Sequence, residues 1–294
     1  MSYPKFETLL YSVEDGIATI TLNRPENLNA FNGQMAADLQ SVFDYTDADD
    51  AVKAVIVTGS GTRAFCSGAD LSGGGFSARA QEAAAAQSGP LVPNRDGAGL
   101  VTLRIFDSVK PIIAAVNAAS VGVGVTMQLP MDFRMGSTAA RFSFAFVKRG
   151  IVPEGASTYF LPRLVGMPKA LEWCYSGRFV PAEEALKFGL LQSVHEPHEL
   201  LPAAREFAKS LISSSAPQSI AMTRRMAWRM TGATHPMQAH QAESMALHYR
   251  FRSGDASEGV QAFLQKREPT YPDKTSDMPD IFPKWMQPKF EDGF

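Results

Sequence analysis

The chain has 294 residues, of which 45% are hydrophobic and 20% are charged, and its net charge at pH 7 is −2. This balance excludes a general nucleic-acid or membrane-surface binder, and the two cysteines supply neither a disulfide framework nor a metal cluster. The first residues lack the basic flank and apolar stretch of a signal peptide, and no apolar run reaches the roughly 20 residues of a membrane span. We therefore expect a cytoplasmic protein with a large core.

The first half of the chain alternates strand and helix patterns. Residues 17–23 alternate as a strand does, and the next segment carries a helical stripe through Met35, Leu39, Val42 and Phe43. Residues 54–58 and 112–116 are continuous apolar runs, which is typical of strands that are buried on both faces. These patterns predict an α/β fold with a parallel or mixed sheet.

The second half is predicted to be mostly helical, which divides the chain into a core over residues 1–200 and a helical region over residues 201–294. Two apolar stripes at helical spacing mark this region, with Leu200, Ala204, Phe207, Ala208 and Leu211 in one and Val260, Phe263 and Leu264 in the other. Met237, Met245, Tyr249 and Phe263 give these helices more apolar surface than one domain edge needs, which predicts an oligomer. The proline-rich end is expected to wrap over a neighbouring surface through Phe282, Trp285 and Phe290.

Residues 73–100 interrupt the core with three glycines, an alanine-rich stretch and a Gly-Pro pair. This composition predicts a flexible insertion with one helical patch. It is either a plain surface insertion or a mobile lid beside a site.

Two turns rich in small residues follow buried strands. In "CSGAD" Gly68 permits an unusual backbone conformation, and Ala69 presents its N–H without a bulky side chain. In "SVGVGV" Val123 lies between two glycines at the start of an apolar run that predicts a buried helix. The two N–H groups either point at one oxygen, as an oxyanion hole does, or belong to turns that serve packing alone.

Sequence signatures of several other chemistries are absent. The two Gly-x-Gly turns lack the third glycine of a dinucleotide fingerprint, and no phosphate-binding loop of the GxxxxGK[ST] type occurs. HExxH, CxxC and GxSxG are also missing, so neither a zinc hydrolase nor a serine hydrolase is indicated.

Three segments closely resemble the crotonase family, the enoyl-CoA hydratases and isomerases. They are "LNRPENLNAFN" at 22–32, residues 51–71, which end in "CSGADL", and residues 110–166, which contain "GVG" and "PEG". The resemblance implies an α/β spiral of strand–strand–helix units followed by a helical trimerisation region. It also implies an acyl-coenzyme A substrate without a separate cofactor or metal, and a homotrimer or a dimer of trimers.

The resemblance places the two oxyanion donors at Ala69 and Val123. Coenzyme A is expected along the turn that holds Ser67, Asp70 and Leu71 and beside the segment Leu28–Ala30, where small residues allow close approach to the backbone. Leu28, Ala30, Ser67, Asp70 and Leu71 are therefore candidate substrate contacts, together with Gly122, Thr126 and Phe146 on the acyl side.

The chain departs from the hydratase pattern at both glutamates that the family's hydratases use. Thr126 occupies the first position and Phe146 the second. Phenylalanine neither activates water nor transfers a proton, and threonine can hold a water but is a poor base. The usual two-glutamate hydration is thus in doubt, whereas Phe146, Phe142 and Phe144 are expected to exclude water from the site.

Glu154 in "GIVPEGASTYF" is the remaining candidate acid. Its position resembles that of the single glutamate in certain Δ3–Δ2-enoyl-CoA isomerases, which predicts an isomerase with Glu154 as the catalytic base. The plainer alternative is a carboxylate at a helix start. Enoyl-CoA hydration remains a second hypothesis, and a CoA-binding scaffold without catalysis is a hypothesis of another class.

Other polar residues receive plainer interpretations. Asp70 and Asp132 are expected to accept hydrogen bonds from nearby backbone groups, and Cys66 has no base partner that would make it a nucleophile. The five histidines lie in the helical half, outside the matched motifs. Arg24 and the pair Lys266–Arg267 are open to two interpretations, as contacts of the coenzyme A phosphates or as solvated surface charge.

Overall fold

The computed structural model describes residues 4–72, 95–280 and 282. Most of the expected insertion, residues 73–94, lies outside the described residues, as do Trp285 and Phe290. Residues 97–100, at the end of that expected insertion, form the first turn of a helix that Asp96 caps. Phe282 packs in a small apolar cluster with Met222 and Ala246, so it does cover a neighbouring surface.

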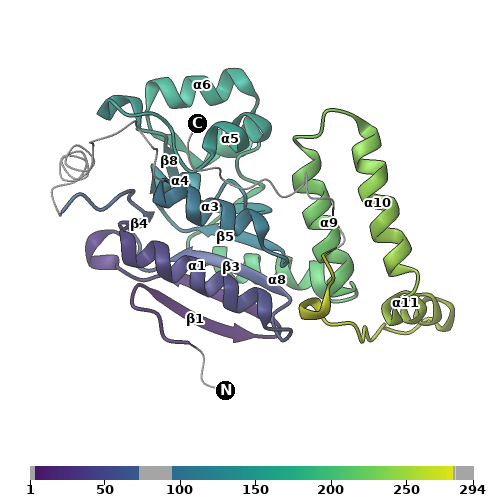
Figure 1. The fold of residues 1–294 in the computed structure, drawn as a ribbon. Helices are drawn as coiled ribbons and strands as arrows, with labels where there is room; N and C mark the ends of the chain where they lie inside the picture. Colours follow the sequence, from purple (N-terminus) through teal and green to yellow (C-terminus); the bar gives the residue numbers. More distant parts are fainter. Residues whose placement is uncertain (1–3, 73–94, 281, 283–294) are drawn as a thin grey trace, which may run out of the picture.

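A six-stranded sheet forms the centre of the fold, in the order β1-β2-β3-β5-β7-β10 (Figure 1). Its strands are β1 (Leu9–Glu14), β2 (Ile17–Leu22), β3 (Ala54–Gly59), β5 (Ile112–Val116), β7 (Phe133–Ser137) and β10 (Ser193–His195). β1 and β2 are antiparallel, and the other neighbours are parallel. The predicted strands over 17–23, 54–58 and 112–116 are thereby confirmed.

A second sheet of four short strands follows the order β4-β6-β8-β9. Its strands are β4 (Ala64–Cys66), β6 (Ala119–Val121), β8 (Arg141–Ser143) and β9 (Val180–Pro181). Because β3 leads into β4, β5 into β6 and β7 into β8, each pair of consecutive strands contributes one strand to each sheet. This repeat is the predicted spiral of strand–strand–helix units.

Helices cover both faces of the large sheet. α1 (Gly33–Ala48) and α3 (Gly97–Asp107) belong to the main core, which also holds one face of β2, β3 and β5. α8 (Leu200–Ile212) covers the opposite face, where Ala204 and Ala208 lie in one cluster with Ile56 and Ile113. α8 therefore packs on the large sheet, although it lies in the segment expected to belong to the C-terminal helical region.

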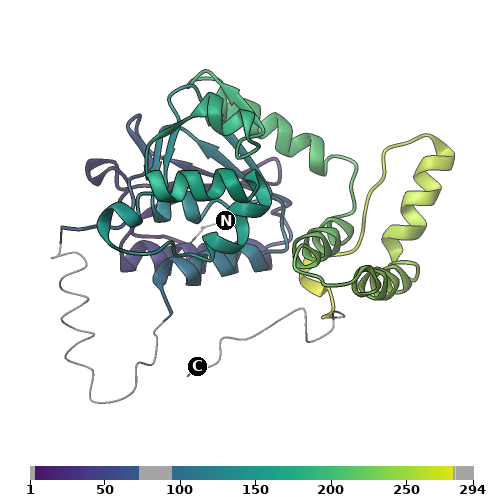
Figure 2. The same ribbon diagram turned by 90° about the horizontal axis from the view of Figure 1, so that it is seen from above.

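The remaining helices connect the sheets or form the C-terminal region. They are α4 (Val123–Thr126), α5 (Ser157–Val165), α6 (Met167–Ser176), α7 (Ala182–Lys187), α9 (Pro217–Met230), α10 (Pro236–Arg250) and α11 (Gly254–Gln265), with single 3₁₀ turns η1 (Pro25–Asn27), η2 (Val147–Arg149) and η3 (Thr275–Asp277). α9 to α11 extend away from the sheets (Figure 2). None of the helices in the described ranges is both long and apolar enough to cross a membrane.

Asp132 and Arg224 join the C-terminal helices to the core. The Asp132 carboxylate accepts hydrogen bonds from the Ile112 N–H at 2.8 Å, from Arg224 Nε at 2.8 Å and from the Trp228 indole N–H at 2.6 Å. The expected backbone contact of Asp132 is thus confirmed. Arg224 also donates to the Phe106 carbonyl at 2.9 Å, which links α9 to the end of α3.

Two glycines let the turns after β4 and β6 approach each other. β4 and β6 pair in parallel, so both strands end at the same edge. Gly68 has a φ of +101°, and a Cβ there would lie 3.0 Å from the Val121 carbonyl oxygen. A Cβ on Gly124 would overlap the Cys66 carbonyl oxygen. The helix expected after this turn is only α4, four residues long.

We predict that Gly124→Ala destabilises the protein by at least about 1–3 kcal/mol, because backbone atoms must shift to admit the methyl group. Gly33→Ala is the matched control, since a Cβ there meets no atom within 4 Å and alanine favours the helix. Urea unfolding of both variants measures the difference. Equal stabilities would contradict the close approach.

Candidate active site

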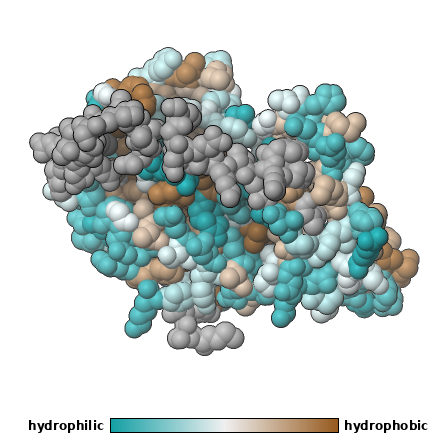
Figure 3. Space-filling view, viewed as in Figure 1, coloured by the Kyte–Doolittle hydropathy of each residue, from teal (hydrophilic) through white to brown (hydrophobic). Residues whose placement is uncertain are grey.

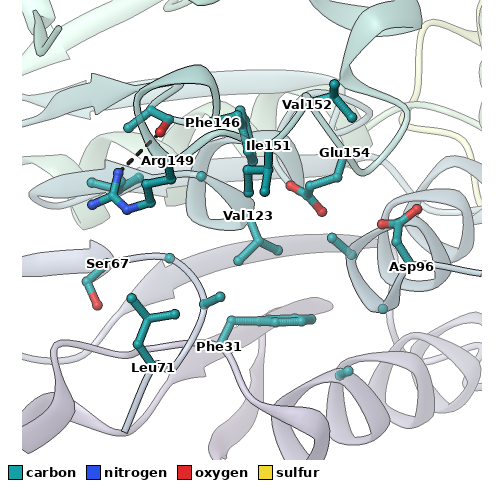
Figure 4. Close-up of a pocket in the computed structure, with 18 of the residues that line it drawn as sticks. Phe31, Ser67, Leu71, Asp96, Val123, Phe146, Arg149, Ile151, Val152 and Glu154 are labelled. Atoms are coloured by element: carbon teal, nitrogen blue, oxygen red, sulfur yellow. Dashed lines mark hydrogen bonds between the residues drawn. The ribbon is translucent and has the colours of Figure 1, made fainter. Parts of the chain in front are cut away.

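A cavity of about 370 Å³ opens where these two turns meet the starts of α1 and α3 (Figure 4). Four groups of residues line it. They are Phe31, Gly33 and Ala36 around the start of α1; Ser67, Gly68, Ala69 and Leu71 after β4; Asp96, Gly97 and Ala98 at the start of α3; and Val121, Gly122, Val123, Ala145, Phe146, Arg149, Ile151, Val152 and Glu154 from β6 to the loop before α5. The wall is mainly apolar, and the carboxyl groups of Asp96 and Glu154 lie at one end.

The N–H groups of Ala69 and Val123 are available to a ligand in this cavity. Neither N–H has a backbone acceptor among the residues that the structure describes. The Ala69 segment pairs with Phe31 through the Gly68 carbonyl and the Asp70 N–H instead, and Val123 is the first residue of α4. Two unpartnered donors from neighbouring turns can bind one oxygen that gains negative charge.

Glu154 lies in the loop before α5 and faces the same cavity (Figure 4). The Thr126 hydroxyl donates a hydrogen bond to Glu154 Oε1 at 2.7 Å. Gly155, with φ +62°, allows this approach, because a Cβ there would lie 3.0 Å from Thr126 Oγ1 and 3.1 Å from Thr102 Oγ1. No side chain caps α5. The position of the carboxyl therefore favours a role in the cavity over the alternative of a helix-start carboxylate.

Its surroundings raise the pKa of Glu154 to about 7. The main cause is burial, which disfavours the charged form, and the negative charge of Asp96 and a hydrogen bond with it act in the same direction. The hydrogen bond from Thr126 lowers the pKa in part. A carboxyl group with a pKa near neutrality can both accept and return a proton.

The three phenylalanines expected to dry the site divide into two sets. Phe146 lines the cavity and is 5% exposed. Phe142 and Phe144 are fully buried in the core, and Phe144 stacks on Trp173 with ring centroids 6.2 Å apart. The expectation was therefore wrong for Phe142 and Phe144, because β8 and the segment after it direct these rings into the packing beneath α6.

Some predicted substrate contacts lie at the cavity and others do not. Among the predicted contacts, those in its wall are Ser67, Leu71, Gly122 and Phe146, together with Ala69, Val123 and Glu154. Thr126 lies behind Glu154 and reaches the site through its hydrogen bond. Leu28, Ala30 and Asp70 do not line the cavity.

Leu28 and Ala30 support the turn from behind. The Leu28 carbonyl accepts the Ser67 N–H at 3.1 Å, and the Ala30 carbonyl accepts Arg24 Nη1 at 2.5 Å. Leu28 and Asn29 both have left-handed backbone, and Asn29 Nδ2 donates to the Ala64 carbonyl at 3.0 Å.

The charged candidates for phosphate contacts are largely paired. Arg24 forms an ion pair with Asp70 at 2.9 Å, and Arg267 forms one with Glu258 at 2.6 Å. Asp70 accepts hydrogen bonds from the backbone N–H and the hydroxyl of Ser72, which confirms the expected local contact with the backbone. These hydrogen bonds are also the largest cause of the low pKa of Asp70, about 2. Burial raises the pKa of Cys66 to about 12, so this thiol is not a nucleophile.

Sequence reasoning missed many residues of the cavity wall, among them Phe31, Asp96, Arg149, Ile151 and Val152. Asp96 carries a signal, since an aspartate ahead of Gly-Ala-Gly and an apolar run is a helix N-cap pattern. Apolar side chains of the other segments give no such signal. No cluster of metal-ligating side chains occurs within the described part of the chain.

The raised pKa of Glu154 predicts a pH-dependent stability difference from Glu154→Gln. Folded Glu154 holds its proton up to a pH of about 7, whereas the unfolded value is 4.5, so its stabilising contribution is complete below pH 4.5 and is lost as pH rises through about 7. Between pH 4.5 and pH 8, the free energy of unfolding of Glu154→Gln should rise relative to that of the native protein by no more than about 3 kcal/mol. Urea unfolding at both pH values measures this gain. A difference that is the same at both contradicts the prediction.

Comparisons with known proteins show which family this chain resembles. The sequence model of the enoyl-CoA hydratase/isomerase family matches residues 12–274. Enoyl-CoA hydratase AFT3-1 of Alternaria alternata is 40% identical over 261 residues, 88% of this chain and 84% of that protein. The 1,2-epoxyphenylacetyl-CoA isomerase of Escherichia coli (strain K12) is 32% identical over 278 residues, 91% of this chain and 99% of that protein.

A solved structure gives the same answer for the fold. The crystal structure of enoyl-CoA hydratase from Bacillus anthracis aligns with a TM-score of 0.80 at 27% identity, over 90% of this chain and 99% of that one. The spiral of paired strands, the two free N–H groups and the sequence matches lead to one conclusion: the chain belongs to the enoyl-CoA hydratase/isomerase family, the crotonase family of enzymes.

Proposed function

We propose that the protein is an enoyl-CoA isomerase that moves a double bond from C3–C4 to C2–C3 of an acyl-CoA thioester. The Glu154 carboxylate takes a proton from C2, and the electron pair moves toward the thioester oxygen to give a dienolate. The N–H groups of Ala69 and Val123 stabilise that oxygen, a contribution of roughly 3–4 kcal/mol per donor. Glu154 then returns the proton at C4, so the enzyme ends as it began.

One observation carries this proposal: Glu154 shares the cavity with the two free N–H groups, while the second carboxylate position of hydratases holds Phe146. A single carboxyl suffices for a proton that leaves C2 and returns at C4. The pKa of Glu154, raised to about 7, suits both halves of the transfer. The apolar wall keeps water away from the dienolate.

The substrate class follows from the same assignment. An acyl-CoA thioester places its carbonyl at Ala69 and Val123, with its pantetheine arm along Ser67 and Leu71. The reaction balances with the substrate and Glu154 alone and uses no separate cofactor. Because Leu28, Ala30 and Asp70 support the turn from behind, we assign them to positioning it.

Hydration of an enoyl-CoA is the second candidate, and the Thr102 hydroxyl favours it. This hydroxyl is buried and has no hydrogen-bond partner among the described residues. It lies near Thr126 Oγ1, since both are within 3.1 Å of the Cβ site of Gly155. A water held by the two hydroxyls beside Glu154 would be a nucleophile for C3. Membership in a family of enzymes favours both reactions over a scaffold without catalysis.

We further infer that the chain forms a homotrimer or a dimer of trimers. Exposed apolar side chains gather on the C-terminal helices, visible over α11 in Figure 3, and include Met237, Met245, Leu247, Phe251, Val260, Phe263 and Leu264. Phe263 is 81% exposed, which is unusual for a phenylalanine of a monomer. Tyr249 differs from the expectation, because it packs partly buried against α9.

Light scattering at micromolar concentration tests the oligomer. We expect the mass of three or six chains, and Phe263→Asp should lower that mass because a charge would be buried in an apolar contact. A monomeric mass for the native protein would contradict the proposal.

We predict that Glu154→Gln lowers isomerase turnover by at least about 10²–10⁴-fold, because glutamine keeps the shape but accepts no proton. Acyl-CoA affinity should stay within about twofold, since the N–H groups are unchanged. The assay follows the conversion of Δ3- to Δ2-enoyl-CoA over several chain lengths, and calorimetry follows binding.

Thr126→Val is the comparison variant. An isomerase should keep most of its turnover in this variant, whereas a hydratase that uses water on Thr126 should lose 3-hydroxyacyl-CoA formation. Near-native turnover of Glu154→Gln on every converted enoyl-CoA would overturn the assignment of Glu154.

A further inference from the structure

Asp96 is a second carboxylate in the cavity, and it joins two elements that are distant in sequence. It is the N-cap of α3, where its Oδ1 accepts the Gly99 N–H at 2.5 Å. The same oxygen accepts the Gly155 N–H at 3.3 Å. One carboxylate oxygen thus holds the loop that carries Glu154 against the first turn of α3.

Asp96 and Glu154 both line the cavity and lie on the same side of it (Figure 4). The charge of Asp96 and a side-chain hydrogen bond with it both act on the Glu154 carboxyl. The negative charge of one carboxyl group disfavours ionisation of a neighbouring one. The hydrogen bonds of the two groups differ. Asp96 accepts two backbone N–H groups at a helix N-terminus, where an anion is favoured, while among the described residues the donor to Glu154 is the Thr126 hydroxyl.

Other groups that face Glu154 leave this difference in place. From α4 comes the Thr126 hydroxyl, and from β4 the neutral thiol of buried Cys66. Arg149 of η2 lines the same cavity, and its guanidinium donates to the Ala145 carbonyl at 3.2 Å. Asp96 is therefore the negative group among these neighbours.

We propose that Asp96 is a positioning residue for Glu154: its two N–H contacts fix the Glu154 loop on α3, and its negative charge makes the Glu154 carboxylate a stronger base. This inference rests on the proposed function in one respect, because it is Glu154 that returns the proton to the substrate. It extends that function by naming the group that raises the proton affinity of Glu154. A stronger base takes the C2 proton more readily, and Glu154 then delivers that same proton to C4.

Asp96→Asn tests the charge while it keeps an N-cap acceptor. We expect the acid limb of the kcat/KM profile for Δ3-enoyl-CoA to move to lower pH by roughly one unit or more. The titration of Glu154, followed by carbon-13 NMR of labelled glutamate and assigned by its loss in Glu154→Gln, should move by the same amount. This second readout needs no activity.

Asp96→Ser and Ser253→Ala separate the charge from the cap. Asp96→Ser keeps a capping oxygen without the charge and should reproduce the shift seen with Asp96→Asn. Ser253→Ala removes the N-cap of α11, far from the cavity, and should lower the melting temperature without moving the titration.

Two results would overturn the inference: a Glu154 titration that stays in place in both Asp96 variants, or an equal shift in Ser253→Ala. Failure of the proposed function would give a different result, namely a Glu154→Gln enzyme that is still active. In that case Glu154 is not the catalytic base, and the NMR titration of Glu154 still tests the effect of Asp96.

Discussion

The close backbone approach of two turns is the constraint on which the rest of the site depends. Gly68 and Gly124 let the exits of β4 and β6 pack with almost no side-chain space between them. The parallel pairing of these short strands sets the two exits at one edge, and the spiral repeat supplies that pairing. The result is a pair of backbone N–H donors in one cavity, supplied by the turns themselves and not by side chains. Such donors are fixed before substrate binds, so they need no reorganisation as charge develops.

The chemistry is then selected by what faces the donors. In the proposed reaction the fold supplies the oxyanion site, and the side chains around it determine which reaction follows. The resemblance to hydratases implies that Thr126 and Phe146 occupy their two carboxylate positions, whereas Glu154 reaches the cavity from the loop before α5. Burial raises the pKa of Glu154 to about 7. Above that pH the buried, charged Glu154 carboxylate lowers the stability of the fold. Near that pH the same side chain can accept and release a proton, and such a trade between stability and activity is common at active sites.

Local patterns predicted the elements of the core, and tertiary packing decided the parts that they missed. The apolar runs of β3 and β5 and the stripe of α1 are periodic signals within one segment, and they were correct. The sequence places Asp96 in a flexible insertion, because no local pattern reveals its contact with Gly155. The two residues are distant in sequence and meet only where the loop before α5 lies against the start of α3. Leu28 and Ala30 were expected at the ligand because small residues permit close approach; they lie outside the cavity wall, and the Leu28 carbonyl accepts the Ser67 N–H of the turn. The apolar stripe of α8 predicted the helix, but it did not predict that this helix packs on the large sheet.

A crystal structure with a non-isomerisable acyl-CoA tests the central claim most directly. The account predicts that the thioester oxygen lies within hydrogen-bonding distance of both the Ala69 and Val123 nitrogens, with the Glu154 carboxyl over C2 to C4 of the acyl chain. A thioester oxygen bound elsewhere, or a Glu154 side chain turned away while a water on Thr126 faces C3, would contradict it.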